Sequence, residues 1–221
     1  MTRIDGTTPA VLLSSVGRPD SPMNGGVSEA HFTADGANIV FRADSEAPNR
    51  HRLYSVPASG GIEPRFLTPM ADEADVRREF ATAGSDFVVY RADARQDEQN
   101  ELFSVPINGS TLPVRLNEPL DPEQRVASFR VGPRGERIFF SVPRFDNVMI
   151  SLQSAPVEGG RVKLHSPGNT AFFEPTADGN RVVYLTDLEG GNRQQLYLDF
   201  LTPQFNPTPD KPLGLRTDKT D

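Results

Sequence analysis

One short segment appears four times along the chain, and this internal repeat limits the fold more than any other feature of the sequence. Each copy joins a polar or glycine-containing turn to a run of apolar and aromatic residues, and the copies begin at residues 33, 82, 132 and 176. They are therefore spaced by 49, 50 and 44 residues. A period of this length is typical of repeat proteins, in which each unit packs against its neighbours.

Two further segments keep the same spacing. Leu-Tyr-Ser-Val-Pro at residues 53–57 matches residues 102–106, 152–156 and, more loosely, 196–200. A Gly-rich turn then leads to a third segment, found at residues 65–68, 114–117 and 162–164. Residues 5–14 carry this turn and third segment without the other two. Because independent segments share one period, a chance match is improbable.

Each repeat predicts four short strands and no helix. The first strand ends in an aromatic residue, and the second follows a turn and is rich in β-branched and aromatic residues. The third alternates apolar and polar residues and ends in proline, and the fourth is the short segment of residues 65–68 and its copies. The 18 glycines and 20 prolines suit a chain of tight turns better than a helical one.

Four-stranded antiparallel units of this length predict the blades of a β-propeller. A single four-stranded sheet has two apolar faces, and face-to-face packing of several blades buries both. Two sets of equivalent residues are expected between blades: the aromatic residues Phe41, Tyr90, Phe140 and Tyr184, and the leucines Leu53, Leu102, Leu152 and Leu196.

We therefore predict an all-β fold, a single β-propeller unit over residues 1–221 with about four four-stranded antiparallel blades. The expected blades are residues 27–68, 76–117, 126–165 and 170–217, with an N-terminal part-blade strand at 3–14 and a Pro-rich tail at 202–221. Residues 10–14 could pair with the last blade and close a four-bladed ring. Alternatively, the blades form an arc of a larger propeller, which a fourth strand at 211–217 would favour, or one half of an eight-bladed ring completed by a second copy.

The repeat resembles the TolB-type, WD40-like propeller repeat. The matching segments are Phe32-Thr33-Ala34-Asp35-Gly36, Thr176-Ala177-Asp178-Gly179, Leu53-Tyr54, Leu196-Tyr197, Gly60-Gly61 and Leu67-Thr68. The resemblance covers nearly the whole chain, although Pro133 alone keeps the proline of the family turn and residues 84–85 are Gly-Ser in place of Asp-Gly. It implies a propeller fold and a periplasmic or extracellular location. The fold hosts scaffolds, lyases, peptidase gates and receptors, so it does not by itself imply one activity.

Composition excludes several classes of function. With 23 basic and 30 acidic residues the net charge is −7, so we expect no nucleic-acid partner. The absence of cysteine excludes disulfides, thiolate metal sites and cysteine nucleophiles. The longest apolar stretch near the start, residues 10–13, is too short for a signal peptide or a membrane span, and we expect neither.

The residue patterns contain no catalytic motif. Neither a G-x-S-x-G motif nor a phosphate-binding glycine loop is present, and His31, His51 and His165 are not spaced as a local metal pair. Arg-Ala-Asp recurs at residues 42–44 and 91–93, and we expect each aspartate to accept backbone amides rather than to bind a cation. The acidic segments 72–75 and 93–98 lack the spacing of a calcium loop. We predict no catalytic residue, no metal and no cofactor.

We predict a non-catalytic scaffold or binding module that binds a protein or a small ligand at the rim of the propeller channel. The loops of this rim carry long polar side chains, and the candidate contacts are Arg50, His51, Arg95, Asp97, Arg144, Asp146 and Arg193. Two alternatives remain. The chain could be the propeller portion of a larger hydrolase, peptidase or lyase whose catalytic residues lie elsewhere, or a structural module of a long repetitive surface protein.

Overall fold

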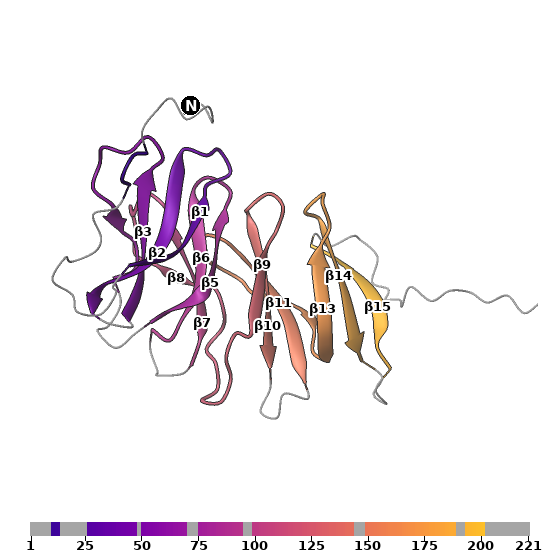
Figure 1. The fold of residues 1–221 in the computed structure, drawn as a ribbon. Coiled ribbons are helices and arrows are strands. Elements are labelled where there is room, and N and C mark those ends of the chain that lie inside the picture. Colours follow the sequence, from indigo (N-terminus) through magenta and orange to yellow (C-terminus); the bar gives the residue numbers. More distant parts are fainter. Residues whose placement is uncertain are drawn as a thin grey trace, which may run out of the picture.

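The computed structural model describes residues 10–13, 26–47, 50–69, 75–94, 99–143, 149–188 and 193–201. These residues form fifteen strands and no helix. The strands make four antiparallel sheets that lie side by side along an open arc (Figure 1). We call the sheets blades 1 to 4 in chain order, and within each blade the strands are neighbours in the order of the sequence.

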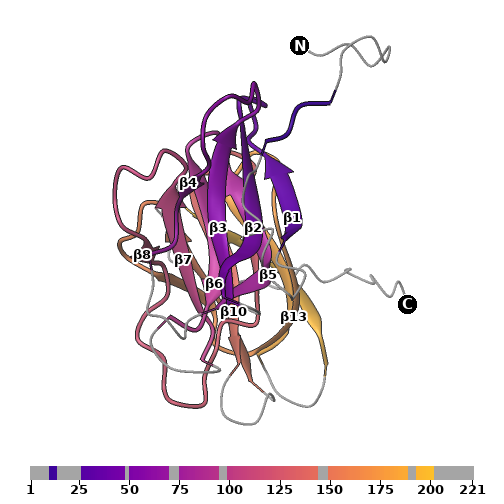
Figure 2. The same ribbon diagram turned by 60° about the vertical axis from the view of Figure 1, so that its left-hand side comes forward.

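Three blades have four described strands and the last has three. Blade 1 comprises β1 (Val27–Phe32), β2 (Asn38–Ala47), β3 (Arg50–Pro57) and β4 (Arg65–Phe66). Blade 2 comprises β5 (Val76–Ala83), β6 (Phe87–Ala92), β7 (Glu101–Pro106) and β8 (Val114–Arg115). Blade 3 comprises β9 (Ser128–Val131), β10 (Arg137–Pro143), β11 (Ile150–Pro156) and β12 (Lys163–Ser166). Blade 4 comprises β13 (Asn169–Pro175), β14 (Arg181–Asp187) and β15 (Gln195–Phe200). The first strands β1, β5 and β13 lie on one side of the arc, and the short fourth strands β4 and β8 lie on the other (Figure 2).

The turn between the first two strands of blade 1 explains why Thr-Ala-Asp-Gly recurs. The Thr33 hydroxyl donates to Asp35 Oδ1 at 2.6 Å, and the Ala37 amide donates to the same oxygen at 3.0 Å. Both bonds lower the pKa of the Asp35 carboxyl, and the bond from Thr33 has the larger effect. Gly36 then adopts a φ of +68°, which glycine reaches without the strain that a Cβ atom would cause. Residues 176–180 of blade 4 repeat these bonds.

Apolar packing between neighbouring blades forms the core. Each blade has a forward face, toward the next blade, and a backward face, toward the preceding one, and we call each interface between two blades a seam. The buried residues on the forward faces of blades 1 to 3 are Val40, Leu53 and Leu67, then Val89, Leu102 and Leu116, then Phe139 and Leu152. The aromatic residues opposite them, on the backward faces of blades 2 to 4, include Tyr90, Phe103, Phe129, Phe140, Phe173, Tyr184 and Tyr197. The aromatic and leucine positions expected between blades are confirmed at these three seams.

Polar side chains also cross the first two seams. In each case a side chain of one blade donates to a backbone carbonyl of the next, so the two blades are fixed in register as well as packed. The pairs are Arg42 Nε to Val76 O (2.7 Å), Arg91 Nη1 to Ala127 O (2.6 Å), Ser55 Oγ to Ile107 O (2.7 Å) and Ser104 Oγ to Val157 O (2.5 Å). The repeated arginine and serine of the sequence therefore act as connections between blades.

The chain forms the arc and not the closed four-bladed ring. Blades 1 and 4 lie at opposite ends of the arc (Figure 1). Residues 10–13 form no strand, and Leu13 packs on the cluster that contains Phe41 and Tyr54 of blade 1. The expectation that residues 10–14 pair with the last blade is therefore wrong for residues 10–13, because blade 4 is at the other end of the molecule. Residues 3–9 and 14, and the strand expected at 211–217, lie outside the described residues.

A close approach between the turns of blades 2 and 3 leads to a prediction about stability. Gly135 has a φ of +74°, and a Cβ atom there would lie 2.4 Å from the amide nitrogen of Gly84. Gly36 occupies the same turn position in blade 1 with a φ of +68°, but a Cβ atom there would meet nothing within 4 Å. We expect Gly36→Ala to lower the free energy of unfolding by about 1 kcal/mol, from backbone strain alone. Gly135→Ala should lower it by roughly 3 kcal/mol, because the backbone of blade 2 must also move.

Urea unfolding of the two variants and the parent chain measures this difference. Gly36→Ala is the matched control, because both variants cause the same backbone strain and only Gly135→Ala adds the clash with blade 2. Equal losses in the two variants would contradict the close approach as the cause.

Candidate functional site

The structure describes three of the seven side chains predicted for the channel rim. Arg50 and His51 are half-buried at the start of β3, and Arg193 is exposed just before β15. The other four, Arg95, Asp97, Arg144 and Asp146, lie outside the described residues. Binding at this rim stays a prediction.

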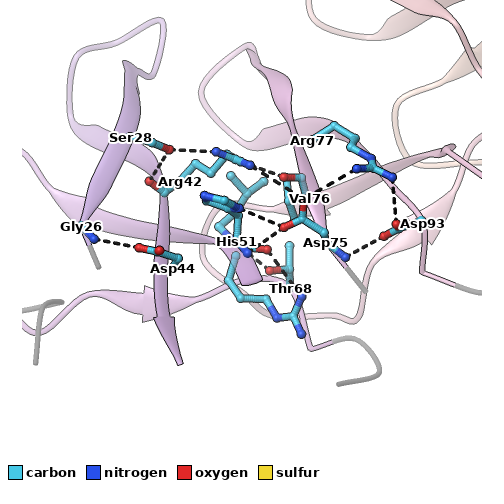
Figure 3. A network of polar contacts seen from close by, with 12 residues as sticks. Gly26, Ser28, Arg42, Asp44, His51, Thr68, Asp75, Val76, Arg77 and Asp93 are labelled. Carbon is cyan, nitrogen blue, oxygen red and sulfur yellow. Dashed lines mark hydrogen bonds and ion pairs between the residues drawn. The ribbon is translucent and has the colours of Figure 1, made fainter. Parts of the chain in front are cut away.

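His51 belongs to a polar network at the seam between blades 1 and 2, which we call the Asp75 cluster: Arg42, His51, Asp75, Arg77 and Asp93 (Figure 3). Asp75 Oδ1 accepts the His51 amide at 2.7 Å and lies 3.1 Å from His51 Nδ1. Asp93 accepts the Asp75 amide at 2.6 Å and Arg77 Nη2 at 2.9 Å. The Arg42 side chain is 5% exposed, and this burial lowers the pKa of its guanidinium. Bonds within the seam thus occupy these groups, and the cluster aligns the two blades.

The recurring aspartates have the structural role that the sequence predicts. Asp44 Oδ1 accepts the amide of Gly26, which precedes β1, at 2.7 Å. Asp93 accepts the amide of Asp75, which precedes β5, in the same way. Each aspartate therefore ties the start of the first strand of its blade to the end of the second. Within the described part of the chain, no three histidine, aspartate or glutamate side chains are close enough together to hold a metal ion.

A cleft of about 510 Å³ opens between blades 1 and 2, at the edge of the arc opposite the Asp75 cluster. The turns between first and second strands and between third and fourth strands of the two blades surround it. The buried bond from Ser55 to the carbonyl of Ile107 lies at its base. Turns held by two neighbouring blades thus form the walls, so the cleft exists only while this seam is intact.

The lining of this cleft combines acidic and apolar groups. Asp35, Glu63 and Asp86 contribute three carboxylates, and Arg65 contributes one guanidinium. Ile62, which is 64% exposed, and Phe87 supply apolar surface. The excess of negative charge favours a ligand that carries positive charge beside a short apolar group. No sequence motif marks this site, because its residues come from four separate turns.

A serine, a histidine and an aspartate are aligned at the seam between blades 3 and 4. Ser154 Oγ lies 2.8 Å from His165 Nε2, and His165 Nδ1 lies 2.5 Å from Asp199 Oδ2. Arg137 Nη1 donates to Ser154 Oγ at 3.1 Å, and Lys163 Nζ lies 2.9 Å from Asp199 Oδ2. The order of these atoms is that of a hydrolase triad, in which an aspartate orients a histidine beside a serine hydroxyl.

Burial prevents this arrangement from acting as a nucleophilic site. Ser154 and the His165 side chain are both 0% exposed, so no substrate carbonyl can reach the serine oxygen. The Ser154 hydroxyl can donate to His165 while it accepts from Arg137, so this buried hydroxyl is hydrogen-bonded on both sides. The alignment therefore serves as a polar connection between blades.

Comparison of the repeats explains how this connection arose. His165 occupies the position of Leu67 and Leu116, both buried at the two preceding seams. Asp199 occupies the position of Val105, which is buried opposite Leu67 at the first seam. A histidine and an aspartate thus replace an apolar pair. An alignment of the repeats could have revealed this replacement, whereas the histidine spacing by itself gave His165 no role.

Burial determines the charge state of this pair. Burial lowers the pKa of His165, although the hydrogen bond to Asp199 and its charge raise the pKa in part. Burial alone would raise the pKa of Asp199, but hydrogen bonds from His165 and Lys163 outweigh it and hold that pKa below its usual value. His165 is therefore neutral near pH 7, with Nδ1–H donating to the aspartate and Nε2 accepting from Ser154.

Acidification should therefore weaken the seam between blades 3 and 4. Because the folded state lowers the pKa of His165, the unfolded chain binds more protons below about pH 6.5, and stability must fall as the pH falls through that value. The lowered pKa of Asp199 adds a further loss below about pH 4. We expect the melting temperature to decline between pH 7.5 and pH 5 in the unaltered chain.

The double variant His165→Leu/Asp199→Val, which restores the residues of the first seam, provides the control. It should show a smaller decline over the same range and should be at least as stable at pH 7.5, because well-packed apolar residues often match a buried charged group and its hydrogen-bond partner. Identical pH profiles for the two proteins would contradict this role of His165.

No family model and no curated protein matches this sequence. Solved structures do match its fold. One is a protein from Agrobacterium tumefaciens described as TolB, with a TM-score of 0.50 and 19% identity over 79% of this chain and 62% of that chain. Another is described as the eukaryotic initiation factor, with a TM-score of 0.54 and 8% identity over 80% and 41% of the two chains. A third is prolyl oligopeptidase B from Galerina marginata, with a TM-score of 0.55 and 15% identity over 84% and 26%.

The chain spans less than two thirds of each of these three proteins. Identities this low establish the fold and not the activity. No helix in the described ranges is long and apolar enough to cross a membrane. Together with the four antiparallel sheets, the similarity confirms the resemblance found in the repeat: the chain has a TolB-like β-propeller fold, present here as an open arc of four blades.

Proposed function

We propose that this chain is a non-catalytic binding module, and that the cleft between blades 1 and 2 binds a segment carrying positive charge beside a short apolar group. The non-catalytic part of this proposal rests on the complete burial of Ser154, the serine aligned with His165 and Asp199. A buried hydroxyl that is already bonded on both sides has no access to a substrate.

The cleft supports the binding half of this proposal. Its volume of about 510 Å³ falls within the range of ligand sites, and its walls are turns held by two packed blades. Three carboxylates against one guanidinium give it net negative charge. A lysine or arginine side chain flanked by an apolar residue matches this lining. Because the turns form an open edge, an extended peptide could enter from solvent.

A peptide-binding measurement tests the proposed ligand class. The probe is a fluorescein-labelled hexapeptide of alternating lysine and leucine, followed by fluorescence anisotropy. We expect saturable binding that weakens with added salt and weakens several-fold in Asp86→Asn, because one carboxylate of the cleft loses its charge. The matched variant Glu158→Gln neutralises an exposed carboxylate of blade 3 outside the cleft, and it should bind as the unaltered chain does.

Two results would contradict the ligand class. One is equal binding of a hexapeptide of alternating glutamate and leucine, which would show that charge does not select the ligand. The other is an equal loss of affinity in Asp86→Asn and Glu158→Gln, which would show that only the overall charge of the chain matters.

Covalent labelling tests the absence of catalysis. A fluorophosphonate probe reacts with activated serines, and we expect no labelling of the folded chain, because Ser154 is inaccessible. Labelling that disappears in Ser154→Ala would overturn the proposal and identify a hydrolase.

The chain could also be the propeller portion of a larger hydrolase, peptidase or lyase. The observation that favours this alternative is that the chain covers only 26% of the prolyl oligopeptidase whose structure it resembles. A screen of hydrolase substrates with this chain should then be blank, while a longer polypeptide containing it would be active.

A further inference from the structure

Within the residues that the structure describes, no blade lies against the forward face of blade 4. Leu196 on this face is 39% exposed, whereas the equivalent leucines of the other three blades, Leu53, Leu102 and Leu152, are 0% exposed under the next blade. Leu196 is thus an exception to the expectation that this leucine lies between blades. Val183, Leu185 and Leu198 belong to the same face and are half-buried. The face is a fourth copy of a surface that the chain covers three times elsewhere.

Two substitutions make this face more apolar than its counterparts. Leu185 occupies the position of Arg42, and Leu198 occupies the position of Ser55. In blade 1 both of those side chains donate to carbonyls of the following blade. With leucine at both positions, a blade packed here would bury no unpartnered donor.

The other end of the arc carries the matching half of a seam. The backward face of blade 1 holds the stacked rings of Phe41 and Tyr54, with centroids 5.5 Å apart. The backward face of blade 2 has the same stacked pair at 5.7 Å, and that of blade 4 has it at 5.6 Å. Blade 1 therefore presents the surface that a forward face normally covers, although no blade precedes it in the described chain.

Residues 10–13 lie where the fourth strand of a preceding blade belongs. At the first two seams, a Cβ atom added to a glycine of the turn after the third strand would meet a side chain of the preceding fourth strand. At Gly109 this side chain is Arg65, and at Gly159 it is Val114. At Gly60 an added Cβ atom would meet Val11 and Leu13. Leu13 also packs on the Phe41 cluster, as Leu67 and Leu116 pack at the two following seams.

Within the described residues, the chain thus has a segment in the place of a fourth strand at one end and a blade with three strands at the other. We propose that two copies of this chain assemble head to tail, so that residues 10–13 of each copy become the fourth strand of blade 4 of the other. The forward face of that blade then covers the backward face of blade 1. This assembly is independent of the proposed ligand and of the cleft between blades 1 and 2.

The repeats also define the register of the new strand pair. Ser55 pairs with Arg65 and Tyr54 with Phe66 in blade 1, and the same positions pair in blade 2. Val11 would therefore lie opposite Leu198, and Leu12 opposite Tyr197. Leu12 is 82% exposed in the single chain, whereas Phe66 at the equivalent position contacts the ring of Tyr54. Pairing would give Leu12 the same contact with a tyrosine ring.

A second copy would cover both exposed ends of the arc, the forward face of blade 4 and the backward face of blade 1. Two four-bladed arcs joined head to tail close a ring of eight blades, a number that propellers adopt, and the two new seams are related by a two-fold axis. Residues 10–13 and blade 4 of one chain lie at opposite ends of the arc (Figure 1), which favours pairing between copies. A ring that closed within one chain, or a blade supplied by another part of a longer polypeptide, would give different results in the experiments below.

Light scattering after size exclusion measures the assembly. We expect the mass of two chains for the unaltered protein and for Leu112→Asp, a variant of an exposed leucine that lies away from both ends of the arc. Leu198→Asp should elute as one chain, because it places a charge on the forward face of blade 4. A single-chain mass for the unaltered protein at its highest soluble concentration would overturn the proposal, as would a dimer that survives Leu198→Asp.

Cysteine cross-linking tests the register and does not depend on a destabilised variant. The natural chain has no cysteine, so Val11→Cys/Leu198→Cys introduces one pair alone. Under mild oxidation we expect a covalent dimer, and none from the control Leu112→Cys/Leu198→Cys. A disulfide within one chain, which would indicate a closed four-bladed ring, overturns the proposal. Equal cross-linking in the control also overturns it.

Discussion

The whole molecule depends on one packing requirement, that a four-stranded sheet has two apolar faces and can bury neither by itself. In this chain the forward faces carry buried leucines and the backward faces carry most of the aromatic rings, so leucines such as Leu53 and Leu102 meet rings such as Tyr90 and Phe140. Burial of these contacts provides the main stabilisation of a repeat structure, in which each unit contacts only its neighbours. The cleft, the polar clusters and the free ends of the arc all result from how this packing begins, continues and stops.

Polar side chains at the seams add orientation to this apolar packing. Arg42 and Ser55 each bond a carbonyl of the next blade, so they fix how the two blades rotate and slide against each other. The seam between blades 3 and 4 uses His165 and Asp199 for the same purpose. A triad of atoms can thus arise as a structural connection, and accessibility distinguishes it from a catalytic site. The cleft differs, because its polar groups line a space open to solvent.

Much of the fold followed from the repeat, because strand length, turn chemistry and apolar positions all recur with one period. The aspartates Asp44 and Asp93 were also predictable, since a strand-end aspartate commonly accepts local amides. The sequence left the open arc as one alternative to a closed ring, because the exposure of Leu196 depends on whether a blade follows it. The cleft was missed because its lining is assembled from turns of two blades. The bond between His165 and Asp199 needed the spatial pairing of positions on different blades.

The pair of His165 and Asp199 also has a consequence for how the repeats find their order during folding. Similar neighbouring units can pair wrongly, and such misassembly is a characteristic failure of repeat proteins. If blade 4 docked behind blade 1 or blade 2, Asp199 would be buried against Leu67 or Leu116 with no partner, which is strongly unfavourable. Blade 3 alone offers it a histidine. The carboxylate of Asp199 and its neutral histidine partner therefore restrict an otherwise interchangeable blade 4 to the position after blade 3.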